Sequence, residues 1–313
     1  MTTRHLLDPE ILPALDAFPQ VSLQKEYLPS IREAASAQVK LVELDELGIT
    51  RTEIHVAGLA PDQPDVRCLL YRPKAPKPGS GAYLHLHGGG YILGSADASD
   101  QHNSGLAAQL GITIISVDYR LAPEHPAPAA LLDGYAALGW LHENAAEFGI
   151  DPTRIAIGGE SAGGGLAAAL AIYARDQGEF PICFQLLTYP MLDDRTGSES
   201  NPGDPLTGEF VWTRDRNQLG WSYYLGESEP SAPVVPAREK NLEGLPATWL
   251  STAALDLFRG ENIVYAERLM AAGVATELIV YPRTCHGFQL ARDASVTGQF
   301  LRDHAEALSR AFA

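Results

Sequence analysis

The chain has 313 residues, of which 45% are hydrophobic and 20% charged, a composition typical of a globular protein with a substantial core. Its formal net charge of -16 at pH 7 repels phosphate backbones and anionic lipids, so nucleic acids and membrane surfaces are not expected partners. Three cysteines without CxxC spacing suit a cytoplasmic location, and no apolar run is long enough for stable membrane insertion.

The first 47 residues are predicted to be helical, because apolar residues recur every three or four positions between residues 28 and 48. After that segment, short apolar runs predict eight strands, at 52–58, 66–73, 82–87, 113–119, 154–159, 183–190, 248–252 and 276–282. Helical stretches separate most of the later runs, which indicates a mostly parallel eight-stranded sheet flanked by helices. The first two strands have no helix between them and are expected to pair antiparallel.

Residues 191–240 interrupt this alternation with a polar, turn-rich segment and a predicted helix at 211–226. We expect a core in two parts, 48–190 and 241–313, and two additions, segments 1–47 and 191–240; long insertions of this kind often form lids or binding surfaces. The family resemblance given below implies that the two additions form a helical cap over the core. The insertion carries four aromatic residues that either line an apolar pocket or form the core of the cap: Trp212, Trp221, Tyr223 and Tyr224.

Residues 159–163 match the pattern G-x-S-x-G and lie between an apolar run and an alanine-rich helical stretch. Small residues permit a sharp turn that presents the Ser161 hydroxyl, and the following helix directs its N-terminal amides toward the same place. The sequence therefore predicts Ser161 as a nucleophile. The alternatives are a glycine-rich anion-binding loop or simple close packing of the helix.

A serine hydroxyl is a poor nucleophile unless a base accepts its proton. Among nine histidines, His286 stands out because it follows a strand and lies in a turn-like segment at the carboxyl edge of the sheet. Asp256 follows the preceding strand and is predicted to orient His286, in the chain order expected for this architecture. The rival carboxylates are Asp193, Asp194 and Glu261.

Residues 87–90, His-Gly-Gly-Gly, directly follow the third predicted strand. Attack on a carbonyl creates an oxyanion that requires hydrogen-bond donors placed in advance, and glycine amides are not shielded by side chains. We predict that the amides of Gly88 and Gly89, together with that of Ala162, form this oxyanion hole. Structural roles near the site are predicted for His87, Gly90 and Glu160.

Together these segments resemble the bacterial esterase branch of the hormone-sensitive lipase family of α/β-hydrolases. The matching segments are 87–91, 117–133, 158–167, 189–194, 255–269 and 285–288. The resemblance implies a serine carboxylesterase that hydrolyses short- to medium-chain esters through an acyl-enzyme on Ser161, without a cofactor. Family members often dimerise, so a homodimer is among its implications. The chain departs from the family pattern at Glu160, where aspartate is usual, and around Asp256, whose flanking residues differ.

Two other functions remain open at this stage. A relative that has lost the catalytic histidine binds a small molecule without turnover, but His286 is present here. His85 and His87 lie two apart on a predicted strand, as in some metal-dependent hydrolases, yet no further ligand cluster follows them closely, so no metal is expected. Cys285 precedes His286, so either it is a small buried side chain or it makes the activity sensitive to thiol reagents.

Overall fold

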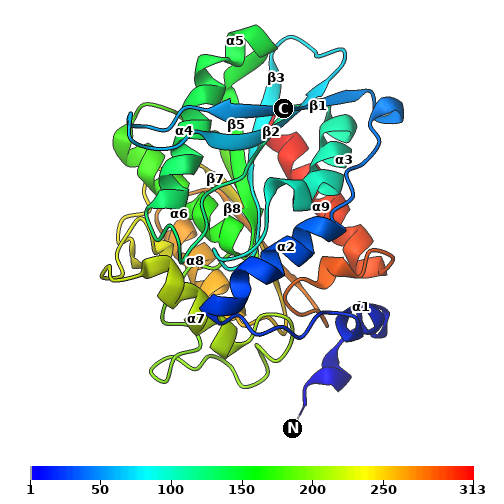
Figure 1. Ribbon diagram of the computed structural model, residues 1–313, viewed down its shortest axis with the longest axis vertical. Coiled ribbons are helices and arrows are strands. Elements are labelled where there is room, and N and C mark those ends of the chain that lie inside the picture. Colours follow the sequence, from blue (N-terminus) through cyan, green and yellow to red (C-terminus); the bar gives the residue numbers. More distant parts are fainter. Residues whose placement is uncertain (1) are drawn as a thin grey trace.

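The computed structural model describes residues 2–313 and contains one eight-stranded sheet, in the order β1-β2-β4-β3-β5-β6-β7-β8 (Figure 1). The strands are β1 (Ile49–Val56), β2 (Val66–Pro73), β3 (Ser80–Leu86), β4 (Thr113–Val117), β5 (Ile150–Glu160), β6 (Phe184–Thr188), β7 (Ala247–Ala253) and β8 (Thr276–Tyr281). β2 pairs antiparallel with β1 and with β4, whereas all other pairs are parallel. The predicted mostly parallel sheet with an antiparallel edge is confirmed.

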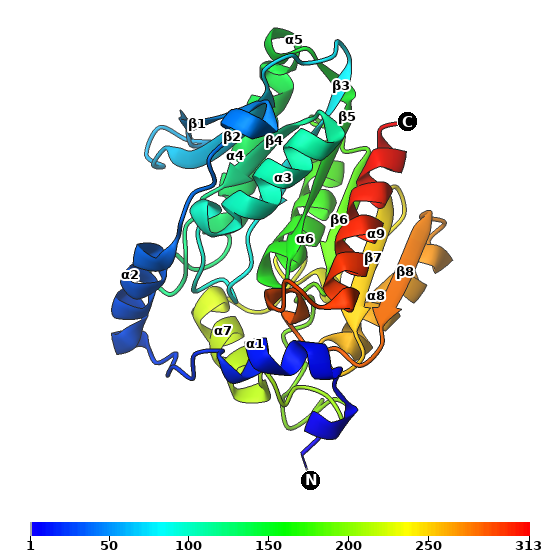
Figure 2. The same cartoon turned by 90° about the vertical axis from the view of Figure 1, so that its right-hand side faces the viewer.

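Helices cover both faces of this sheet (Figures 1 and 2). One face carries α3 (Asp100–Leu110) and α9 (Ser295–Ala311), and the other carries α4 (Ala129–Glu143), α6 (Ala162–Gln177) and α8 (Arg259–Ala271). The short helix α5 (Ala145–Phe148) precedes β5. Short 3-10 turns occupy Arg4–Leu6, Pro9–Ile11, Lys25–Tyr27, Asp45–Leu47, Ala96–Ser99, Pro236–Arg238 and Phe288–Leu290. Within residues 2–313, no helix combines the length and apolar character needed to cross a bilayer.

The turn between β5 and α6 lies close against the end of β3. A Cβ atom placed on Gly159 or Gly163 would lie 2.0 Å from the carbonyl oxygen of Leu86, a separation that no real side chain tolerates. Glycine at both positions therefore lets the start of α6 approach the backbone of β3 directly. This contact brings His87, which follows β3, and Ser161, which follows β5, to the same edge of the sheet.

Three helices lie beyond the carboxyl ends of the parallel strands, where Figure 2 shows them together. They are α1 (Leu12–Asp16) and α2 (Leu28–Gln38) from the N-terminal segment and α7 (Arg214–Leu225) from the insertion. α7 begins at Thr213, whose hydroxyl accepts a hydrogen bond from the amide of Arg216 at 3.5 Å, as expected of an N-cap threonine. The helix predicted at 211–226 is thus present.

The prediction that the first 47 residues are helical is wrong for residues 17–24 and 39–44, which contain no helix. α2 ends at Gln38, and Val39 is extended, with φ -66° and ψ 127°. The amide of Val42 instead donates to the buried carboxylate of Asp100 at 2.7 Å, and the Val42 carbonyl accepts from Arg51 at 3.2 Å. These contacts with distant residues satisfy the backbone of this segment, so it does not need helical hydrogen bonds.

Candidate active site

Ser161 lies at the turn between β5 and α6, with the unusual backbone angles φ 57° and ψ -119°. A non-glycine residue in this region of φ and ψ is strained, by about 1–3 kcal/mol. Hydrogen bonds on both sides hold it there: the Ser161 amide donates to the Thr188 carbonyl, and the Ser161 carbonyl accepts from the Met191 amide, each at 2.9 Å. The turn is therefore built against the loop that follows β6.

His286 and Asp256 reach Ser161 from the loops that follow β8 and β7. His286 Nε2 lies 2.9 Å from Ser161 Oγ, and His286 Nδ1 lies 2.7 Å from Asp256 Oδ2. Asp256 is 1% exposed, and its other oxygen accepts from the amide of Phe258 at 2.9 Å. The carboxylate assigns the proton of the imidazole to Nδ1, which leaves Nε2 free to accept from the serine hydroxyl.

Aromatic rings confine the imidazole of His286. The ring of Phe258 meets it edge-on, with centroids 5.2 Å apart, and the ring of Tyr189 lies 4.7 Å away on a tilt. His286 itself is 6% exposed. These contacts restrict rotation of the imidazole, so its two nitrogens stay aligned between the serine and the carboxylate.

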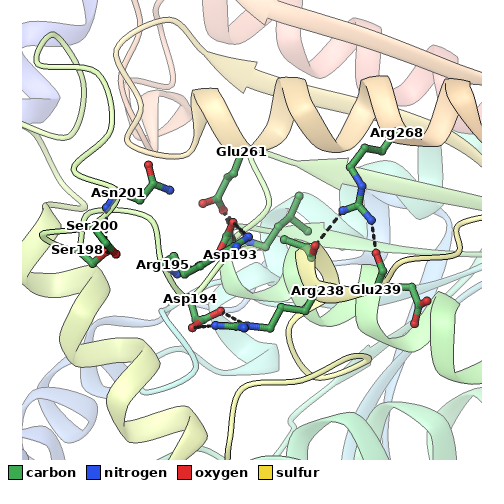
Figure 3. Close-up of polar contacts among 12 residues, drawn as sticks. Asp193, Asp194, Arg195, Ser198, Ser200, Asn201, Arg238, Glu239, Glu261 and Arg268 are labelled. Atoms are coloured by element: carbon green, nitrogen blue, oxygen red, sulfur yellow. Dashed lines mark hydrogen bonds and ion pairs between the residues drawn. The ribbon is translucent and has the colours of Figure 1, made fainter.

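The rival carboxylates Asp193 and Asp194 have arginine partners elsewhere (Figure 3). Asp193 forms a two-oxygen contact with Arg195 at 2.7–2.8 Å, and Asp194 forms a similar one with Arg238 at 2.7 Å. Both carboxylates are thus engaged in ion pairs within their own cluster.

The third rival, Glu261, belongs to the same cluster, where its side chain is partly buried (Figure 3). Its carboxylate accepts from the amide of Leu192 at 2.7 Å and from that of Asp193 at 3.4 Å. Burial raises the pKa of Glu261 well above its ordinary value, and the neighbouring Asp193 adds to the effect. The contact with His286 is made by Asp256.

The glycines after β3 form a loop over Ser161. Gly89 has φ 128° and Gly90 has φ 63°, values that side-chain-bearing residues rarely adopt. Gly88 and Gly89 line the same cavity as Ser161. Ala162 is fully buried as the first residue of α6 and, within the described residues, is not among those lining this cavity.

The cavity beside Ser161 has a volume of about 360 Å³. The N-terminal segment and the insertion both line it, with Phe18, Val21, Leu23, Val211, Trp212 and Arg216. The parts of the chain that interrupt or precede the α/β alternation therefore form walls of the space in which a substrate would bind.

The aromatic residues of the insertion divide between the two roles that the sequence left open. Trp212 lines the cavity, and its ring centroid lies 6.5 Å from that of His286. Tyr224 stacks on Tyr91 at 3.8 Å, and Trp221 packs against the same ring at 5.5 Å. Tyr223 also packs against the buried core. Only part of this aromatic group thus faces the cavity.

His87 stabilises the glycine loop through a hydrogen bond to the loop backbone and through ring stacking. Its Nδ1 donates to the Gly88 carbonyl at 2.9 Å, and its ring stacks on Tyr119 with centroids 4.1 Å apart. The Tyr119 hydroxyl donates to the His87 carbonyl at 2.6 Å. Burial lowers the pKa of His87, so the ring is a neutral packing element.

Glu160, next to Ser161 in the chain, contacts the buried side chain of His85. His85 Nε2 donates to its carboxylate at 3.1 Å, and Asn103 contacts the other ring nitrogen of His85 at 3.1 Å. Burial opposes ionisation of Glu160, but the neighbouring His85 outweighs it and lowers the pKa of the carboxyl to about 2. Sequence analysis placed His85 within a strand and weighed it only as a metal ligand paired with His87, so it had no signal for this contact.

Cys285 is 2% exposed, and burial raises the pKa of its thiol to about 12. The side chain is a protonated packing group in the core beside His286.

A model of the alpha/beta hydrolase fold family matches residues 83–290, which is most of the chain. The chain is an α/β-hydrolase. Within that superfamily it belongs to the hormone-sensitive-lipase-like branch of bacterial esterases.

Several relatives of this α/β-hydrolase are named as esterases. Carboxylesterase NlhH of Mycobacterium tuberculosis is 36% identical over 294 residues, covering 90% of this chain and 88% of its own. Esterase LipI of the same species is 34% identical over 304 residues, with the same coverage. Among solved structures, Bacterial Heroin Esterase aligns over 100% of both chains, with a TM-score of 0.91 and 39% identity. Esterase LipW of Mycobacterium marinum aligns over 99% of this chain and 97% of its own, with a TM-score of 0.84 and 36% identity. The chain is thus a member of a family of carboxylic ester hydrolases.

Proposed function

We propose that this α/β-hydrolase cleaves carboxylic esters through an acyl-enzyme on Ser161. The observation that carries the proposal is the continuous contact from Ser161 Oγ through His286 to Asp256 at the wall of the cavity. A serine, an imidazole and a buried carboxylate in this order are the parts that nucleophilic acyl transfer requires.

In the first half of the reaction, Ser161 Oγ attacks the ester carbonyl carbon as His286 Nε2 takes the hydroxyl proton. The tetrahedral intermediate collapses when His286 gives that proton to the departing alcohol, leaving the acyl group on Ser161. Asp256 stabilises the imidazolium that forms between these two transfers.

In the second half, His286 removes a proton from water as the water oxygen attacks the acyl carbon. The bond from this carbon to Ser161 Oγ then breaks, His286 returns the proton to Oγ, and the carboxylic acid leaves. Both tetrahedral intermediates carry a negative oxygen, for which we assign the amides of Gly88, Gly89 and Ala162 as donors. The first two residues line the cavity beside Ser161, and the third follows it in the chain.

We further propose that the substrates are small esters with short to medium acyl chains. The cavity of about 360 Å³ is near the lower end of the range that small-molecule sites occupy, roughly 300–1,000 Å³. Its walls include the apolar side chains of Phe18, Val21 and Trp212, which suit a hydrocarbon chain. The cytoplasmic location stays a prediction from the sequence.

The test is hydrolysis of p-nitrophenyl esters of increasing acyl length by the wild type and by Ser161→Ala. We expect turnover to peak at short or medium chains and to fall by about 10⁶-fold in the variant, the scale seen when a triad serine is removed. Ser30→Ala, which removes an exposed hydroxyl on α2, is the matched control and should keep wild-type rates.

A binding protein without turnover is the competing function, and covalent labelling distinguishes it. A reactive organophosphate should add one phosphoryl group to Ser161, visible in the intact mass and absent from Ser161→Ala. A chain that binds short esters tightly but neither hydrolyses them nor takes up the label would contradict the esterase proposal.

A further inference from the structure

A second polar cluster lies next to the nucleophile and includes Glu160, the residue that precedes Ser161. His102 from α3, His304 from α9 and Glu160 from the end of β5 meet there. One ring nitrogen of each histidine and one carboxylate oxygen of Glu160 all lie within 4.8 Å of one another. The two imidazole rings meet edge-on, with centroids 4.9 Å apart.

Both histidines carry a buried nitrogen that has no hydrogen-bond partner among residues 2–313. These atoms are Nε2 of His102 and Nδ1 of His304. A buried polar atom without a partner costs about 1–3 kcal/mol, so native structures rarely retain one without a ligand, water or ion to satisfy it. Both unpartnered atoms belong to histidines whose rings meet at the Glu160 carboxylate, which indicates an occupant between these side chains.

A third histidine, His85, forms a hydrogen bond with the Glu160 carboxylate. His85 donates from Nε2 to Glu160 at 3.1 Å and receives Asn103 at its other nitrogen, also at 3.1 Å. This series of hydrogen bonds fixes the orientation of the Glu160 carboxylate. The carboxylate oxygens can still accept further hydrogen bonds or bind a metal ion. Ligating side chains in metal sites are held in the same way by an outer layer of hydrogen bonds.

We propose that His102, His304 and Glu160 bind one divalent transition-metal ion, with Zn²⁺ the best match. Two imidazoles and one carboxylate are a ligand set that zinc accepts, with a fourth position open for water. Zinc–nitrogen bonds of about 2.1 Å place ligand atoms at most about 4 Å apart, so small side-chain rotations bring the three groups into range.

The position of the cluster lets a cation enter from solvent and links the cation to the turn that carries Ser161. His102 lines the cavity beside Ser161 and also a second cavity of about 450 Å³, which Gln101 and Gln289 help to line. A cation can therefore reach the ligands from solvent. Once bound, it joins α3 and α9 to the residue that precedes Ser161, so it stabilises the turn on which the nucleophile sits.

The test measures metal directly. The full chain is treated with a chelator, dialysed into metal-free buffer and titrated with Zn²⁺ by calorimetry, with the bound metal counted by mass spectrometry after gel filtration. Cobalt(II) is added in a parallel sample, because its visible absorption reports coordination by protein ligands. The variants are His102→Ala and His304→Ala, and the control is His55→Ala, which removes an exposed histidine on β1.

We expect one zinc ion per wild-type chain, a melting temperature that rises with zinc, and affinity weakened by at least about 100-fold in each ligand variant but unchanged in the control. Loss of an outer-layer partner alone costs roughly 10- to 100-fold, so loss of a ligand should cost more. His102 is only half-buried, so its variant keeps the test valid if His304→Ala fails to fold. Absence of stoichiometric binding, or equal binding by wild type and both variants, would overturn the proposal in favour of a buried water.

Discussion

Replacing Gly89 by alanine tests the proposed oxyanion hole without removing any functional side chain. The new Cβ would lie 2.2 Å from the carbonyl oxygen of Leu93, whereas ordinary contacts begin at 3.4 Å, so the backbone must move by about 1.2 Å. The residue also has φ 128°, which strains an alanine. A displacement of about 1 Å in a reacting geometry costs on the order of 100-fold in rate, and loss of one oxyanion donor costs about 100- to 1,000-fold.

We therefore expect kcat/KM of Gly89→Ala for a short p-nitrophenyl ester to fall about 100- to 1,000-fold, mostly through kcat. Gly105→Ala is the matched control: this glycine lies inside α3, and an added Cβ meets no atom within 4 Å. Alanine there favours the helix by about 0.5–1 kcal/mol, so the control should be active and slightly more stable. A folded Gly89→Ala with kcat/KM within about threefold of wild type would refute the assignment of this loop.

Three further outcomes follow from other groups. Asp256→Asn should lower kcat by about 10⁴-fold with the fold retained, because the amide no longer imposes the Nδ1–H tautomer on His286; steady-state kinetics and a far-UV spectrum check both parts. The raised pKa of Glu261 means that the folded chain binds more protons than the unfolded chain above pH 4.5, so stability falls as pH rises there. Glu261→Gln should therefore unfold at higher urea than wild type at neutral pH and at similar urea near pH 4; a gain of equal size at both would contradict this. Iodoacetamide at neutral pH should leave Cys285 unmodified and activity unchanged, since its thiol is buried and protonated; mass spectrometry of the peptide that contains Cys285 would reveal any adduct and separate it from one on the partly exposed Cys183.

The sequence by itself predicted the order of strands and helices, because that information is local. Apolar runs and the helical patterns between them each extend over a few residues, and the structure has the eight strands that these patterns predicted. Strand ends in a parallel sheet share one edge, so placing Ser161, Asp256 and His286 after strands was enough to expect their contact. The structure brings them together across 125 and 30 residues of chain.

Tertiary structure alone decided the features that depend on contacts between distant side chains. α2 stops at Gln38 because Asp100 binds the backbone of Val42, 58 residues away, which no helical periodicity records. The meeting of His102 and His304 at Glu160 is of the same kind: each histidine lies in an ordinary helical stretch, and nothing in the spacing of either signals the other. Local patterns determine which element a residue joins, but the packing of α3 and α9 on one face of the sheet determines which of their side chains meet at Glu160.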